Sequence, residues 1–456
     1  MDLTRVIIMT ITFQLKTSLV LASPLLIAFG CNATAEKTTW SPTVLGYEPP
    51  TPGLFGDWGG MRTTLADNGF NYALIYSTES AYNAYGGFNT DKHFAFADQT
   101  ALLFNQDLEQ LTGISDAKIE GLITNRNHDD NLTTERVQDP RARFNDLTQE
   151  VWGGGSITRL GYLTFSRTFD DRKLKWRIGQ MNYQQTFDQS IPCDFQVLSL
   201  CGGKSAYAQT WSTWNIHSWG TTFAYALTSE VTIKTGVLEQ NPRANERSRS
   251  WSFNSNGSKG VLLPLEVEYK TMVNGLPGVY NAGILYTNSP QYDLYTPAGK
   301  ATKVYDNTWF FWGGFNQQIT QKPADREQGM SISASMSVAD ERSNPYHIVA
   351  SAEMRYRGLF DARPQDYLGL GVSWFDMSNH LAQSARESNY SNNIRDYYNP
   401  LYQPVAGNAI NFDLYYRLRP VSWLDIQPDI QYWINPGGIK ETKDALVIGL
   451  KTAVRF

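Results

Sequence analysis

The last fourteen residues of this 456-residue chain, positions 443–456, read KDALVIGLKTAVRF. Apolar side chains, with one threonine among them, fall on alternate positions from Leu446 to Phe456, and Lys451 and Arg455 fall between them. This period of two predicts a β-strand with one apolar and one polar face, because successive side chains of a strand point to opposite sides. Such a strand needs an apolar environment on one face and a wet one on the other.

The same alternation recurs along most of the chain, and it is clear at 263–270, 348–357 and 410–419. Strands are expected wherever runs of this kind occur between turn-forming residues. The runs predict about sixteen strands, at 70–86, 96–110, 114–127, 157–169, 173–182, 219–228, 230–240, 262–273, 279–288, 304–318, 327–339, 345–357, 367–377, 406–418, 422–433 and 443–456.

The links between these segments are of two kinds. Some are short turns, such as 170–172 and 420–421. Others are long and polar, at 128–156, 183–218, 241–261 and 378–405. Tight turns on one side and long loops on the other are typical of outer-membrane barrels. We expect one long loop, either 128–156 with Arg136, Arg141, Arg143 and Glu150 or the segment 183–206, to fold inward and narrow the lumen.

The composition argues against a membrane protein built from helices. The chain is 41% hydrophobic and 13% aromatic, and beyond its N-terminus it has no run of the roughly 20 apolar residues that a membrane helix needs. A secreted β-sandwich or propeller has a similar composition. The apolar rows are thin and aromatic, as in 309–312 (WFFW), which favours a lipid-facing band over a packed core. The predicted fold is all-β, a transmembrane antiparallel β-barrel of about sixteen strands with a short N-terminal periplasmic helix.

The first residues predict export. Residues 1–35 have the properties of a signal peptide, with basic residues, an apolar stretch too short to span a membrane, and Ala33-Thr34-Ala35 as the cleavage site. A lipoprotein site at Cys31 is the alternative, although Ala28-Phe29 makes a poor lipobox. We expect residues 36–69 to form a periplasmic segment, and residues 70–456 to form the barrel in the outer membrane of a Gram-negative cell.

A short amphipathic helix is predicted over 57–69, with Asp57 as its N-cap and Gly69 at its end. Within it, Arg62 has two possible roles, a structural salt bridge or contact with the lumen. The first is the commoner role for such a residue.

Without residues 1–35 the chain carries 37 Lys and Arg against 43 Asp and Glu. This mild acidity argues against a nucleic-acid partner, which selects basic surfaces. Cys193 and Cys201 remain, and outside the cytoplasm so close a pair predicts a disulfide, here closing a small loop on the extracellular side. Two free thiols are the alternative. The spacing, with no nearby His, is poor for a metal, so we expect no metal and no cofactor.

Catalytic chemistry is not predicted. The five histidines are scattered without metal-ligand spacing, and no G-x-S-x-G occurs. Glu266 and Glu268 share one strand face, but such carboxylate pairs arise in any polar lumen. The protein is therefore not expected to be an enzyme.

Four sequence blocks, spread over most of the chain, are distinctive: 52–70 (PGLFGDWGGMRTTLADNGF), 177–182 (RIGQMN), 363–371 (RPQDYLGLG) and 427–438 (QPDIQYWINPGG). Together they resemble the carbohydrate-selective porin family (OprB-like). The resemblance implies a barrel of about sixteen strands and passive uptake of monosaccharides and small oligosaccharides into the periplasm. One departure is Gly-Gln at 179–180, where the family pattern has Gly-Lys, and it puts identical selectivity in doubt.

The final aromatic residue, Phe456, looks like the signal by which outer-membrane proteins reach the barrel-assembly machinery. The expected partners are this machinery, outer-membrane lipid and small sugars. Three alternatives remain open, namely a general or organic-acid porin, a secreted sugar-binding β-protein and an outer-membrane hydrolase. The number of barrels that associate is not predicted.

The polar strand faces supply candidate pore-lining residues of both charge signs, which suits a neutral polar solute. The alternative for each is a cross-strand pair that only supports the wall. Two tryptophans in the long loop are either a sugar slide or part of the interfacial belt, and Trp219 is expected in the belt. The substrate-binding candidates are Lys118, Glu120, Arg126, Lys175, Arg177, Glu353, Arg355, Arg357, Trp211 and Trp214, with Glu266, Glu268, Lys270, Asp413 and Arg417 as further members of the polar faces.

Overall fold

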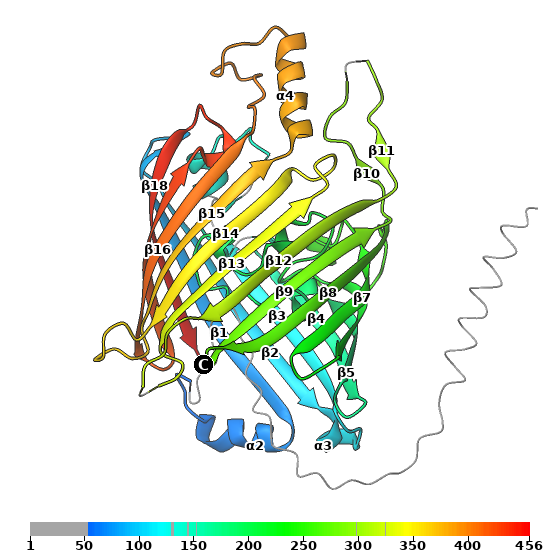
Figure 1. Cartoon of the computed structure of the whole chain (residues 1–456), viewed down its shortest axis with the longest axis vertical. Helices are drawn as coiled ribbons and strands as arrows, with labels where there is room; N and C mark the ends of the chain where they lie inside the picture. The colour runs from blue at the N-terminus through cyan, green and yellow to red at the C-terminus, as the bar shows by residue number, and fades with distance from the viewer. Residues whose placement is uncertain (1–52, 129–131, 144–145, 152, 298, 324) are drawn as a thin grey trace, which may run out of the picture. The chain divides into compact units, whose positions relative to one another are not determined.

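The computed structural model describes residues 53–128, 132–143, 146–151, 153–297, 299–323 and 325–456. The predicted signal peptide and residues 36–52 of the predicted periplasmic segment lie outside this range. Sixteen antiparallel strands close into a barrel, in which each strand pairs with its neighbours in sequence and β1 pairs with β18 (Figure 1).

All sixteen predicted strands are present, with ends that shift by a few residues. Two further short strands, β10 (Gln291–Tyr292) and β11 (Val304–Tyr305), form a separate hairpin. The barrel strands are β1 (Phe70–Gly87), β2 (Phe94–Asp107), β3 (Ala117–His128), β4 (Thr158–Phe169), β5 (Leu174–Met181), β6 (Ser218–Ala226), β7 (Val231–Gln240), β8 (Gly260–Val273), β9 (Leu276–Thr287), β12 (Thr308–Gln318), β13 (Gly329–Ala339), β14 (Tyr346–Arg357), β15 (Tyr367–Met377), β16 (Asn408–Val421), β17 (Leu424–Ile434) and β18 (Lys443–Arg455).

Helical segments lie in the links between the strands and before the first strand. The longest is α4 (Asn379–Ser391), which lies in a segment predicted to be a polar loop and begins where the Ser378 side chain accepts a hydrogen bond from Leu381 N. The others are η1 (Trp58–Gly60), α2 (Met61–Asp67), α3 (Leu108–Thr112), η2 (Thr133–Val137), η3 (Tyr183–Gln185), η4 (Leu198–Leu200), η5 (Lys204–Tyr207), η6 (Arg247–Arg249) and η7 (Pro436–Gly438). None of the described helices is long and apolar enough to cross a membrane.

Two of the predicted strands are too long, because another local structure forms at one end of each. The strand predicted at 304–318 begins only at Thr308, since Val304 and Tyr305 pair with the β10 segment instead. The strand predicted to reach residue 110 ends at Asp107, whose carboxylate accepts a hydrogen bond from Glu109 N at 3.0 Å and starts α3.

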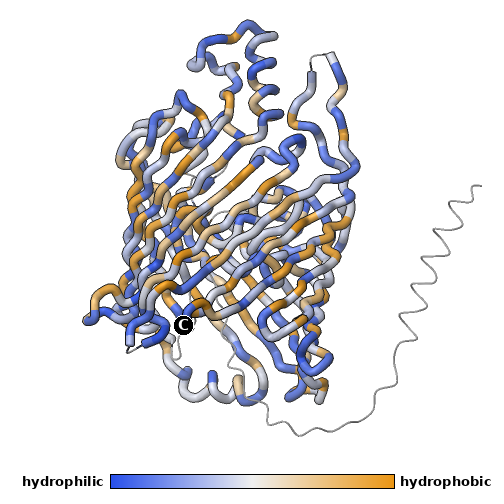
Figure 2. Tube along the Cα trace, in the orientation of Figure 1, coloured by the Kyte–Doolittle hydropathy of each residue, from blue (hydrophilic) through white to orange (hydrophobic). Residues whose placement is uncertain are grey.

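The predicted alternation of faces is confirmed in β18. Ile448 and Leu450 are 48% and 40% exposed on the outside, whereas Val447 and Lys451 are fully buried within the barrel. Figure 2 shows hydrophobic and hydrophilic residues alternating along the strands, and mainly hydrophilic residues along α4. The outer surface therefore suits lipid, and the inner surface carries the polar groups.

The N-terminal helix is fixed to the end of the last strand. Asp57 Oδ1 accepts a hydrogen bond from Thr63 N at 2.9 Å, and Gly69 ends the segment with φ +79°. Arg62 Nη2 donates to the Phe456 carbonyl oxygen at 2.6 Å, and its guanidinium lies 4.5 Å from the centre of the Tyr72 ring. Arg62 thus has a structural role.

The two ends of the barrel differ. At the turn end, where α2 and α3 lie, strands are joined by links as short as 274–275 and 422–423. At the loop end, where α4 lies, most links are long, and 88–93 and 340–345 are the short ones (Figure 1). Two of the long links, the β3–β4 loop (residues 129–157) and the β5–β6 loop (residues 182–217), determine the shape of the lumen.

Candidate functional site: a lumen narrowed by two loops

The β5–β6 loop lies inside the barrel, and Asp194 is its central anchor. The Asp194 carboxylate accepts hydrogen bonds from Arg355 Nε at 2.8 Å and from the Tyr415 hydroxyl at 2.6 Å. Its carbonyl oxygen accepts one from Gln427 Nε2 at 2.9 Å. Burial alone would raise the pKa of Asp194, yet the guanidinium groups of Arg355 and Arg417 hold it well below its usual range. One loop residue thus contacts β14, β16 and β17 together.

The same loop is also attached to the opposite wall. Asp188 N donates to Glu266 Oε2 on β8 at 2.7 Å, and the Asp188 carboxylate accepts from Asn281 Nδ2 on β9 at 3.0 Å. Further along, the loop returns to the wall that Asp194 contacts, where the Ser199 hydroxyl lies 2.7 Å from that of Ser373 on β15. These contacts carry the loop across the lumen.

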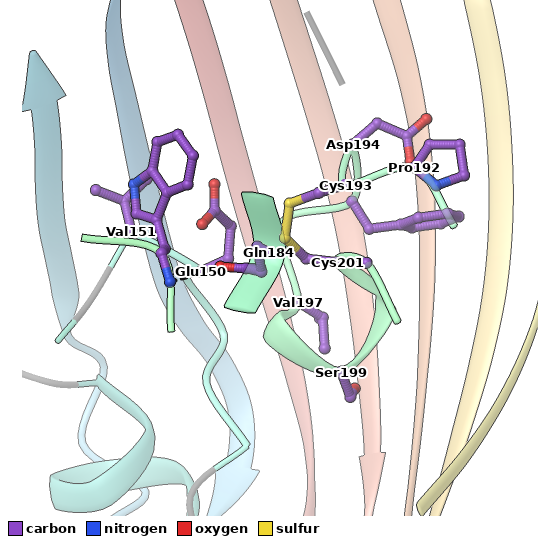
Figure 3. Close-up of a disulfide and its surroundings, with 12 residues drawn as sticks. Glu150, Val151, Gln184, Pro192, Cys193, Asp194, Val197, Ser199 and Cys201 are labelled. Carbon is purple, nitrogen blue, oxygen red and sulfur yellow. Dashed lines mark hydrogen bonds between the residues drawn. A yellow bond between two sulfur atoms is a disulfide. The ribbon is translucent and has the colours of Figure 1, made fainter. Parts of the chain in front are cut away.

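Cys193 and Cys201 form a disulfide within this loop (Figure 3). The bond was predicted to close a small loop on the extracellular side, and that location is wrong. Cys193 precedes Asp194, and the contacts of Asp194 with wall residues draw the bridge into the barrel. Glu150 lies close enough that its carboxylate and the two sulfurs fall within 4.8 Å of one another. Both sulfurs are bonded to each other, so the group lacks free thiolates.

The β3–β4 loop also folds inward, so both of the loops considered for this role enter the lumen. Val151 N donates to Glu79 Oε2 on β1 at 2.9 Å, and the Glu150 carboxylate lies 3.2 Å from Lys451 Nζ on β18. The Thr148 carbonyl oxygen accepts a hydrogen bond from Gln431 Nε2 on β17 at 2.9 Å. This loop is therefore held by the strands at which the barrel closes.

The two loops are joined by backbone hydrogen bonds. Glu150 N donates to the Gln196 carbonyl oxygen, and Leu198 N donates to the Leu147 carbonyl oxygen, each at 2.9 Å. The Asp146 carboxylate accepts from Ser199 N at 2.9 Å. Together the loops form one platform across the barrel.

Three predicted pore-lining residues hold this platform in place. Besides its contact with Asp194, Arg355 lies 2.9 Å from Glu353, and both side chains are buried. Arg126 donates to Gln99 Oε1 at 2.8 Å and to the Gly153 carbonyl oxygen at 3.2 Å.

The two candidate tryptophans lie inside the barrel. Trp211 is buried, with its ring stacked on Tyr183 at a centroid distance of 4.1 Å. Trp214 is half-buried, and its Nε1 donates to Gln99 Oε1 at 2.8 Å. Trp219, by contrast, is 41% exposed on the outer face of β6, as expected of a belt residue.

The remaining candidates on β3 and β5 form a basic face, defined here as Lys118, Glu120, Lys175 and Arg177. Arg177 Nη2 lies 3.1 Å from Glu120, and Arg177 Nη1 donates to the Gln185 carbonyl oxygen at 2.5 Å. Neither Lys118 nor Lys175 forms a hydrogen bond or ion pair with any other part of the described chain. The basic face therefore has three cations for one carboxylate.

The other charged candidates are paired with neighbouring side chains. Arg357 donates to Gln365 Oε1 at 2.7 Å and pairs with Glu327. On β7 and β8, Lys234 lies 2.9 Å from Glu266 and 2.7 Å from Glu268. These pairs are the supporting cross-strand contacts that the sequence allowed as the alternative.

Several important residues were not among the predicted site residues. Glu79 and Lys451 face each other in register on β1 and β18, and their side chains are 2.9 Å apart. Both lie on the polar faces of alternating segments, so the alternation was a usable signal for them. Asp194 lies in a loop, where no periodicity indicates which way a side chain points.

Residues 91–456 match the family described as "Carbohydrate-selective porin, OprB family". Porin B of Pseudomonas aeruginosa is 33% identical over 422 residues, which cover 90% of this chain and 92% of that protein. QuiX of Acinetobacter baylyi is 32% identical over 413 residues, covering 88% and 93%. The structure of Pseudomonas putida OprB at high pH is similar with a TM-score of 0.87 and 33% identity, covering 90% of this chain and 99% of that one.

Proposed function

Since this chain belongs to the carbohydrate-selective OprB family of porins, we propose a route by which sugars cross its barrel. The protein is an outer-membrane porin of a Gram-negative cell, a channel and not an enzyme, and it admits small sugars by passive diffusion. By the usual asymmetry of such barrels, the turn end faces the periplasm and the loop end faces the outside.

The proposed route passes the platform on the side of the basic face. The supporting observation is that Lys118 and Lys175 form no hydrogen bond or ion pair in the described chain, while the Glu120 side chain beside them, paired with the buried Arg177, is 18% exposed. The two lysine ammonium groups can donate hydrogen bonds to a sugar's hydroxyl groups, and the Glu120 carboxylate can accept hydrogen bonds from them. Binding at such an open face is weak, as transport requires, because a tightly held solute would block the channel.

Planar-bilayer recordings test this route. Glucose or a short maltodextrin should lower the ionic conductance reversibly, with an affinity near the millimolar range, about -4 kcal/mol. Lys175→Gln should weaken this block. Lys270→Gln, which removes the same charge from β8, should leave it unchanged.

The opposite results would be decisive. Equal block in wild type and Lys175→Gln would exclude the basic face from the route. A current that ignores every sugar but responds to organic acids would favour the organic-acid porin instead.

We further propose that Phe456 is read by the barrel-assembly machinery. Its support is the placement of Phe456 directly after β18, which pairs with β1 to close the barrel. Deleting Phe456 should reduce the amount of heat-modifiable barrel in the outer membrane, whereas Phe456→Tyr should not. Normal insertion of the shortened chain would contradict this.

A further inference from the structure

A cavity of about 270 Å³ lies at the loop end, away from the basic face. It is formed between the β3–β4 loop and the segment 378–407, which carries α4. Apolar groups such as Leu381 and Pro404 supply part of its lining. Its polar lining residues are Arg141, Arg143, Ser384, Ser388 and Gln403.

The walls of this cavity are fixed by contacts within the protein. Arg141 donates to both carboxylate oxygens of Asp139, at 3.0 and 2.7 Å, and to the carbonyl oxygens of Tyr397 and Asn399. On the other side, Asn389 Nδ2 donates to the Gln403 carbonyl oxygen, and Gln403 N donates to Asn389 Oδ1, both at 2.8 Å. The cavity is thus preformed, which lowers the cost of binding a ligand.

The other polar side chains that line the cavity have no hydrogen-bond partner in the described part of the chain. Within the described ranges, the Arg143 guanidinium, the Ser384 and Ser388 hydroxyls and the Gln403 carboxamide form no hydrogen bond with another residue. Ser384 and Ser388 are four residues apart on α4, so their side chains lie on one face of the helix. Four side chains with free hydrogen-bonding capacity therefore converge on one space.

The charge of the cavity is positive. Asp139 neutralises Arg141, while Arg143 is exposed and has no carboxylate beside it among the lining residues. The lumen platform differs, since there each of the main cations meets an acid or a carbonyl group. An unpaired guanidinium presents a planar set of donors that matches a carboxylate.

We propose that this cavity binds a monoanionic sugar acid, with the carboxylate on Arg143 and the hydroxyl groups on the two serines and Gln403. The volume is below the roughly 300–1,000 Å³ of pockets for larger ligands, so it suits a single sugar ring. This site goes beyond the proposed function, because it lies away from the basic face and has a different ligand chemistry. Its position at the loop end would retain such a solute at the channel entrance.

Calorimetric titration of the detergent-solubilised full-length protein tests the proposal with glucuronate, glucose and acetate as probes. Glucuronate should bind at least tenfold more tightly than glucose, which lacks the charge, and than acetate, which lacks the hydroxyls. Arg143→Gln should weaken glucuronate binding at least tenfold. Arg136→Gln, in the same loop but away from the cavity, is the matched control.

Two results would overturn the proposal. One is equal binding of glucuronate and glucose, and the other is unchanged glucuronate binding by Arg143→Gln. The double variant Ser384→Ala/Ser388→Ala gives a second check, because it should reduce binding of glucuronate but not of acetate. Glucose block of the bilayer current should persist in all these variants, so failure here is distinguishable from failure of the sugar route.

Discussion

The wall made of β14 to β18 and the wall made of β2 to β6 have the same alternation of faces but use their inward charges differently. On the first wall, Arg355, Arg417 and Lys451 each contact a residue of the inward loops. On the second wall, Arg126 and Arg177 also contact loop residues, whereas Lys118 and Lys175 contact no described loop residue. An inward charge is therefore not in itself a sugar contact, since a loop can occupy it.

The difference follows from the cost of burying charge. A guanidinium or ammonium group withdrawn from water needs a partner. Where the loops cover the first wall, they supply carboxylates or carbonyl groups, such as Asp194 for Arg355 and the Phe195 carbonyl oxygen for Lys451. Where the wall stays wet, lysines need no partner, and they remain available to a solute.

The variant with the largest expected effect on this difference between the walls is Arg355→Ala. It leaves Asp194 and Glu353 buried without their main cation, and losing one partner of a buried pair costs about 3–5 kcal/mol. We expect the β5–β6 loop to be released, with a larger single-channel conductance and a lower unfolding temperature in detergent.

The matched control is Arg357→Ala, two residues away on the same strand face. Its partner Glu327 is largely exposed, and exposed pairs contribute at most about 1 kcal/mol. Equal effects of the two variants on conductance would show that Asp194 does not anchor the loop.

The second variant tests the disulfide within the platform. Replacing both Cys193 and Cys201 by Ser should cost about 2–3 kcal/mol or less, since a short disulfide-closed loop constrains few residues. Sugar block should survive, while open-channel noise rises because the loop moves more. A reductant should produce the same noise in the wild type if it reaches the bond. Current traces as quiet as those of the wild type would contradict this expectation.

The third variant, Arg177→Gln, lies at the border of the two walls, because Arg177 contacts both Glu120 and the β5–β6 loop. We expect weaker glucose block by about 1.5–3 kcal/mol, the value of hydrogen bonds to a charged group. Lys175→Gln should also weaken the block but leave the unfolding temperature unchanged. A normal block by Arg177→Gln with a lower unfolding temperature would make Arg177 purely structural.

The last prediction concerns pH and the contact between the two loops. Burial raises the pKa of Asp146 from 3.8 to about 7, despite hydrogen bonds from Ser199 and Asn411. Because the folded protein holds this proton more tightly, the contribution of Asp146 to stability is complete below pH 4 and is lost as the pH rises through 7. Asp146→Asn should flatten this dependence in unfolding titrations between pH 4.5 and 7.5. The same pH dependence of the unfolding free energy in the variant and the wild type would refute this role of Asp146.

The sequence predicted the barrel strands better than the positions of the loops inside the barrel. Alternation found the strands and faces, including Ile448 outside and Lys451 inside, because lipid and water impose a period of two. It did not show that both long loops turn inward or that Asp194 meets Arg355, since these contacts join residues 161 positions apart. Arg355 was correctly placed on the inner surface, but its loop partner has no local signature.

The disulfide inside the barrel has a consequence for the order of events during biogenesis. Cys193 and Cys201 lie in a platform enclosed by wall strands, beside Asp194 and Glu150. A protein oxidase is too large to enter such a lumen, so enzymatic formation of the bond must precede closure of β1 on β18. Oxidation in the periplasm would then act as a checkpoint, because the inserting machinery would receive a chain in which this part of the inward loop is already cross-linked.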